Sequence, residues 1–155
     1  PDRVGRDRLA DAAAAAAHYP LPCMTVDMGT ATTMTVIDRE ARVLGGAIIP
    51  GVGISLEALA NGTSQLPHIS LDAPKKCIST DTVEAMRSGS VYGTAAMLDG
   101  MIERMEAELG EPAAVIATGG LGGCIIPYCR REITYDKNLL LNGLWALYQK
   151  NKRKR

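Results

Sequence analysis

Apolar and polar residues alternate in blocks along the chain, and the blocks predict where strands lie. Three β-branched or apolar runs occur close together, at residues 24–28, 32–37 and 43–48. Charged residues at 38–42 separate the last two runs, as expected of a hairpin turn. The pattern therefore predicts a three-stranded meander.

Helical spacing and propensity mark most of the rest of the chain. The alanine-rich residues 8–17 favour a helix, which the prolines at 20 and 22 end. Residues 82–109 place apolar side chains near helical spacing and predict one long or kinked helix, although Gly89 and Gly93 weaken its middle. The other predicted elements are helices at 55–59, 121–129 and 138–149, strands at 113–117 and 132–134, and a loop over 61–78.

This order of elements predicts the fold class. A meander followed by strand–helix units gives a mixed α/β sheet with helices packed on it, the arrangement of a ribonuclease-H-like lobe of the actin and sugar-kinase superfamily. Two such lobes form a cleft, and the sequence accounts for one. Because the chain does not begin with Met, we expect residues 1–22 to be a helical linker from a missing first lobe. Residues 23–150 are then the second lobe, and residues 151–155 a basic tail.

Composition narrows the environment and the partners. A chain of 155 residues with 46% hydrophobic residues suits one packed domain. Seventeen basic and seventeen acidic residues cancel, so the net charge predicts neither a nucleic-acid nor a membrane partner. Without a secretory leader or a bilayer-length apolar run, we expect a cytoplasmic protein. Its four cysteines, at 23, 77, 124 and 129, show no zinc spacing and are expected to be reduced thiols.

A polar cluster follows the first predicted strand. Asp27, Gly29 and Thr30 stand between two apolar runs, at a strand-to-strand turn. An acidic oxygen ligand, a glycine that permits close backbone approach and hydroxyl donors together suit a phosphate with its cation. The alternative is an ordinary turn, in which such residues are common.

Several motifs occur in the order found in one enzyme family. They are Gly5-Arg6-Asp7-Arg8, Asp27-Met28-Gly29-Thr30-Ala31-Thr32, Gly45-Gly46-Ala47-Ile48-Ile49-Pro50-Gly51 and Thr118-Gly119-Gly120, with further likeness at 81–82, 89–93 and 138–144. With these motifs the chain resembles type III pantothenate kinase over nearly its whole length. That family phosphorylates pantothenate with ATP to 4'-phosphopantothenate, the first step of coenzyme A biosynthesis.

The resemblance implies a role for each motif residue. Asp7 would be the catalytic residue, which orients the substrate hydroxyl and accepts its proton. Pantothenate would be bound by Gly5, Arg6, Asp7, Arg8 and Thr82. Asp27 would hold a monovalent cation, K⁺ or NH₄⁺, while Thr30 and Gly29 would contact the ATP that arrives with Mg²⁺. The resemblance also implies a homodimer whose active site borrows residues from the partner.

The sequence departs from the family and leaves alternatives open. The lobe that carries the family's N-terminal Asp-x-Gly-Asn-Thr phosphate loop is missing, so we expect the chain to be inactive by itself. A non-catalytic relative with the same fold, acting as a regulatory or binding module, is the alternative function. The glycines at 119–123 do not match the Gly-x-Gly-x-x-Gly motif of a dinucleotide site, because the sixth position counted from Gly120 is Ile125. Met86, Met97, Met101 and Met105 are read as core filler or as a subunit seam.

Overall fold

A five-stranded mixed sheet lies at the centre of the computed structural model, which describes residues 5–152. Its strands are β1 (Cys23–Met28), β2 (Ala31–Ile37), β3 (Val43–Pro50), β4 (Ala114–Thr118) and β5 (Thr134–Tyr135). The spatial order is β3-β2-β1-β4-β5. β1, β2 and β3 pair antiparallel, whereas β4 is parallel to β1 and β5 is parallel to β4. The predicted meander and mixed sheet are confirmed.

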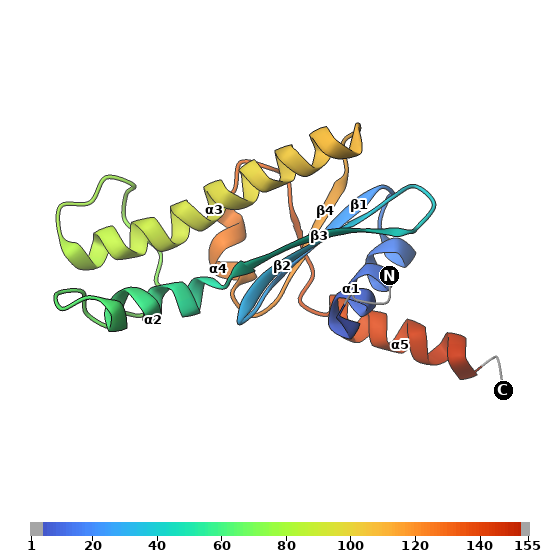
Figure 1. Cartoon of the computed structure of the whole chain (residues 1–155), viewed down its shortest axis with the longest axis horizontal. Coiled ribbons are helices and arrows are strands. Elements are labelled where there is room, and N and C mark those ends of the chain that lie inside the picture. Colours follow the sequence, from blue (N-terminus) through green and yellow to red (C-terminus); the bar gives the residue numbers. More distant parts are fainter. Residues whose placement is uncertain (1–4, 153–155) are drawn as a thin grey trace.

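Helices cover both faces of this sheet (Figure 1). They are α1 (Arg6–His18), α2 (Val52–Gly62), α3 (Thr82–Leu109), α4 (Gly122–Ile125) and α5 (Leu139–Lys152), with a 3₁₀ turn, η1 (Ile126–Tyr128), after α4. The long helix predicted over 82–109 is confirmed with both of its bounds. Asp81 caps its start by accepting a hydrogen bond from the Glu84 amide at 3.0 Å. Gly110 ends it with a left-handed φ of 84°.

Several predicted elements differ in extent from the observed ones. The helix expected over 121–129 is wrong: α4 is one turn long and passes into η1, because Pro127 has no amide hydrogen to continue the α-helical ladder. The helix expected over 55–59 is observed over 52–62 as α2, and the short strand expected at 132–134 is observed at 134–135 as β5. Of the predicted basic tail, residues 151 and 152 belong to α5, and residues 153–155 lie outside the described part.

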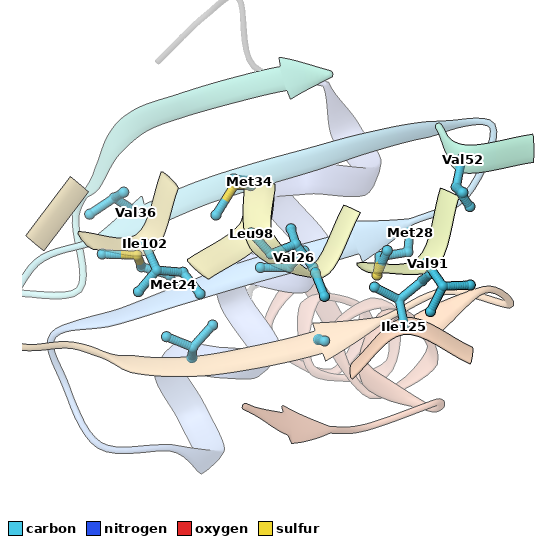
Figure 2. Close-up of a cluster of buried hydrophobic side chains, with 13 residues drawn as sticks. Met24, Val26, Met28, Met34, Val36, Val52, Val91, Leu98, Ile102 and Ile125 are labelled. Carbon is cyan, nitrogen blue, oxygen red and sulfur yellow. The ribbon is translucent and has the colours of Figure 1, made fainter. Parts of the chain in front are cut away.

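Alternate residues of β1 serve the two faces of the sheet. Met24, Val26 and Met28 point toward α3 and pack with Leu98 and Ile102 (Figure 2). Cys23 lies on the other face, in a cluster with alanines of α1 and Leu139 of α5. By the same alternation, Thr25 and Asp27 face the side of α1.

The contact between α1 and α5 depends on small residues. A Cβ at Gly143 of α5 would lie 1.9 Å from the Ala10 carbonyl oxygen of α1, so the two backbones meet directly. The alanines of α1 similarly let the helix lie close to the sheet, where Ala10, Ala14 and Ala15 are fully buried. This packing fixes α1, and with it the Gly-x-Asp-Arg motif, against β1 and β2.

Candidate active site

Asp27 occupies the end of β1, between two strands. It pairs in register with Thr33 of β2 and with Thr118 of β4. The turn after β4 passes so close that a Cβ at Gly119 would lie 2.6 Å from Asp27 Oδ1, and Gly119 has a φ of 93°. Only glycine combines this conformation with this approach. The Thr118-Gly119-Gly120 motif is therefore shaped around the Asp27 carboxylate.

Asp7 lies in the exposed first turn of α1. Its Oδ1 would be 2.6 Å from a Cβ at Gly5, so its carboxylate turns back over the glycine that precedes the helix. A negative side chain at this position is favoured by the positive end of the helix dipole. Gly5 thus leaves the space that the Asp7 carboxylate occupies.

The charge of Asp7 acts on Asp27 through space. Burial, and next the charge of Asp7, raise the pKa of Asp27 above its usual value. Two carboxylates on different elements therefore share one electrostatic environment, on the face of the sheet that α1 covers. The packing of α1 against β1 brings the start of the helix within electrostatic reach of Asp27.

Asp11 joins these two carboxylates, and the motif comparison missed it. It lies one helical turn after Asp7 and is only 2% exposed. Burial, and next the charges of Asp27 and Asp7, together raise its pKa from 3.8 to about 7. The available signal was its spacing of four residues from Asp7, which places both on one face of α1.

Arg8 is bonded to the sheet. Its Nε donates to Thr35 Oγ1 at 3.0 Å and its Nη2 to the Met34 carbonyl at 3.2 Å. A Cβ at Gly46 of β3 would lie 2.9 Å from Arg8 Nη2 and 1.7 Å from the Met34 oxygen. Two of the sequence motifs thus interlock here. Its neighbour Arg6 is exposed at the first residue of α1.

Gly29 and Thr30 form the tight turn between β1 and β2. The Gly29 amide donates to the Ala31 carbonyl at 3.1 Å, and the Gly51 amide donates to the Thr30 carbonyl at 3.2 Å. A Cβ at Gly51 would lie 2.2 Å from the Thr30 oxygen, so α2 begins directly against this turn. Thr30 itself is exposed beside the first turn of α2.

Thr82 lies apart from the acidic residues. It is the exposed first residue of α3 and lines a groove of about 610 Å³ between α2 and α3. Figure 1 shows this end of α3 at the opposite end of the molecule from α1. The structure therefore brings together Gly5, Asp7 and Asp27, with the Gly29–Thr30 turn at the same strand end, but it does not bring Thr82 to them.

The site offers oxygen ligands without a preformed metal cage. Within residues 5–152, no group of three or more His, Cys, Asp and Glu side chains is arranged to hold a metal ion. The ion pairs found in that range leave out all three aspartates of the site. A cation bound here would take part of its oxygen ligands from elsewhere.

Comparison with known proteins identifies the family of this chain. The family model for type III pantothenate kinase matches residues 1–104. The chain belongs to the type III pantothenate kinase family. The Rhodospirillum rubrum type III pantothenate kinase is 42% identical over 97% of this chain, and the Shouchella clausii enzyme is 45% identical over 97%. The chain spans 59% of the length of each of these curated relatives.

Solved structures confirm the fold class of this family member. A Campylobacter jejuni protein assigned to the Baf family of transcriptional activators matches with a TM-score of 0.67 and 25% identity, over 97% of this chain and 66% of that one. The activator of 2-hydroxyisocaproyl-CoA dehydratase from Clostridium difficile, solved with ADPNP, matches with a TM-score of 0.54 and 14% identity, over 96% of this chain and 68% of that one. The predicted ribonuclease-H-like lobe is thereby confirmed.

Proposed function

We propose that this chain is one lobe of an ATP-dependent pantothenate kinase, an enzyme that forms 4'-phosphopantothenate in the first step of coenzyme A biosynthesis. The observation that carries the proposal is the shared environment of Asp7 and Asp27, two motif residues from different elements. Family membership indicates the substrate class, and the acidic pair marks the proposed location of phosphoryl transfer. The chain alone is proposed to be inactive.

Asp7 is the proposed catalytic residue. It is exposed at the start of α1, so an alcohol can reach its carboxylate. Phosphoryl transfer depends mainly on positioning and charge neutralisation, and a carboxylate that orients the hydroxyl and accepts its proton meets the first need. Gly5, Arg6 and Arg8 would then complete the pantothenate site around it.

Asp27 is the proposed ligand of a monovalent cation, K⁺ or NH₄⁺. The residues fit such an ion, because three neighbouring carboxylates have no ion-pair partner within residues 5–152, and the buried Asp11 Oδ1 has no hydrogen bond there. Carboxylate and carbonyl oxygens are the donors that hard cations take. When bound, the cation would neutralise negative charge beside the phosphates.

Thr30 and Gly29 are the proposed contacts to ATP, which would enter with Mg²⁺. The Gly51 amide donates a hydrogen bond to the Thr30 carbonyl of this turn, so the backbone that carries the exposed Thr30 hydroxyl is fixed in place. The first turn of α2 begins at the same place and directs backbone amides toward it. An anionic phosphate would gain from both features.

A second lobe is proposed to complete the cleft. The chain spans only 59% of the length of its relatives. On α5, an apolar stripe at helical spacing remains exposed: Leu141 at 65%, Leu144 at 51%, Trp145 at 63% and Tyr148 at 56%. Because α5 lies on α1, which carries Asp7, this stripe is the surface proposed to contact the other lobe.

The reducing cytoplasm is the proposed compartment, since all four cysteines are free thiols. Among the described residues, no helix combines the length and the apolar character needed to cross a bilayer. The balanced charge gives no reason to propose a nucleic-acid or membrane partner.

A homodimer is proposed to bring Thr82 to Asp7. Thr82 is distant from Asp7 within one chain, whereas the groove beside it is open and apolar at Ile49, Leu59 and Met97. Gly89 and Gly93 of α3 line this groove, and a Cβ at either would meet nothing within 4 Å. A second copy placed on this surface could supply Asp7 to Thr82.

Co-expression of two inactive variants tests the shared site. Full-length Asp7→Asn and Thr82→Val proteins are each expected to lose activity at limiting pantothenate. Mixed dimers contain one intact site if that site joins Asp7 of one chain to Thr82 of the other. About a quarter of wild-type activity should return, because random pairing makes about half of the dimers mixed. No recovery would place both residues in one chain.

The decisive test of the function is ADP formation. The chain is joined to the remaining lobe in the full-length protein and assayed with pantothenate, Mg²⁺ and K⁺, beside this chain alone. We expect pantothenate-dependent ADP from the full-length protein and none from the chain. The Campylobacter relative suggests the second candidate, a regulatory module. Full-length protein that folds and binds ATP without forming ADP would favour that module.

A further inference from the structure

Asp11 is a buried acid for which the described chain provides no partner. It is 2% exposed, and its Oδ1 is one of two buried side-chain polar atoms within residues 5–152 that make no hydrogen bond. A buried carboxylate oxygen without a partner is costly, and such atoms are rare in folded proteins. A ligand that binds the Asp11 Oδ1 atom would remove this cost.

The surroundings of Asp11 are negative. Apart from burial, the strongest influences on its pKa are the charges of Asp27 and Asp7, and both raise it. The nearest basic residue in the motif, Arg8, is directed to Thr35 and Met34 on β2. The charges of Asp7 and Asp27 thus both reach Asp11, and within residues 5–152 none of the three acids forms an ion pair.

We propose that Asp11 is a second anionic ligand of the monovalent cation site, where its buried Oδ1 and the Asp27 carboxylate share one ion. The inference rests on the proposed role of Asp27. It adds a residue that none of the sequence motifs contains. It also gives the orphaned oxygen its partner.

A cation accounts for the arrangement better than a neutral partner does. Asp11 is buried, and Ala14 and Ala15, which share its face of α1, pack in the cluster between α1 and the sheet, so an ion beside Asp11 would sit between the helix and the sheet. Water alone would satisfy the hydrogen-bonding capacity of Oδ1 but would leave the repulsion among three carboxylates. A shared positive ion removes both costs.

The test measures cation binding by the full-length protein, in the absence of ATP and without any assay of kinase activity. Thermal unfolding is followed at pH 8 while KCl replaces choline chloride at constant ionic strength. In the wild-type protein the melting temperature should rise with K⁺ to a plateau, because a ligand of the folded state stabilises it. In Asp11→Asn the K⁺ midpoint should shift upward by at least about tenfold, as expected for losing one charge next to an ion.

Two further variants make the result decisive. Asp27→Asn should lose the rise in melting temperature with K⁺. Asp99→Asn removes an equal charge from a carboxylate that holds the Arg130 and Arg131 amides, and should keep the wild-type midpoint. A wild-type midpoint in Asp11→Asn, or a wild-type full-length protein with no response to K⁺, would overturn the proposal. The kinase proposal would stand in either case, since it is decided by ADP formation.

Discussion

Asp7→Asn is expected to reduce the turnover of the full-length enzyme by about a hundredfold to a thousandfold. The change keeps the size of the side chain but removes the negative oxygen that accepts the hydroxyl proton. Losing one interaction made mainly in the transition state typically costs about 3 to 4 kcal/mol of barrier. Because Asp7 is exposed in the first turn of α1, the fold should be retained.

The measurement is kcat at saturating ATP and pantothenate, together with the melting temperature. Glu57→Gln provides the control, since it removes one exposed carboxylate from α2 in the same lobe. The control should keep normal turnover and stability. If Asp7→Asn retained turnover within about threefold of the wild type, Asp7 would not be the proton acceptor.

The three-stranded meander and the place of Asp27 at a strand end could be predicted because local patterns determine them. The β-branched runs define β1, β2 and β3, and the charged segment between the last two leaves only a hairpin. Asp27 follows an apolar run directly, so its place at a strand end can be read from the sequence. The motif resemblance then supplied Asp7, which no local pattern distinguishes from an ordinary acidic residue at a helix start.

Other features depend on tertiary contacts that no single segment contains. The helix predicted over 121–129 failed because Pro127 divides it into α4 and η1. The hydrogen bonds of Arg8 could not be foreseen, since they depend on Gly46 of β3 leaving room for its guanidinium. The separation of Thr82 from Asp7 is likewise a property of the assembled sheet and of the long α3.

The sequence around Asp11 gives no sign of a functional residue. It stands at the head of a run of alanines, which carries a strong helix signal and no chemical one. Helical spacing alone would have placed it on the face of Asp7, but only the packed structure shows that this face is buried against the sheet. Burial turns an unremarkable side chain into one that affects both the stability and the charge of the site.

Asp11→Asn is therefore expected to stabilise this chain above neutral pH in a buffer of choline salts. Folding raises the pKa of Asp11 from 3.8 to about 7, chiefly by burial. Between these values the folded state holds a proton that the unfolded state has lost. The stability that Asp11 contributes is thus complete below pH 3.8 and is lost as the pH rises through about 7. Asparagine has no such loss.

The difference between the two proteins gives the size of the effect. From pH 5 to pH 7.5, the free energy of unfolding of Asp11→Asn should rise by roughly 2 to 3 kcal/mol relative to the wild type, since one pKa unit corresponds to about 1.4 kcal/mol. Urea unfolding at several pH values measures it. Thr25→Val, a change in the buried β1 residue beside Asp27 that does not titrate, should give a difference independent of pH. A flat difference for Asp11→Asn as well would mean that Asp11 is charged in the folded chain across this range. Its negative oxygen would then have a stabilising partner even without K⁺.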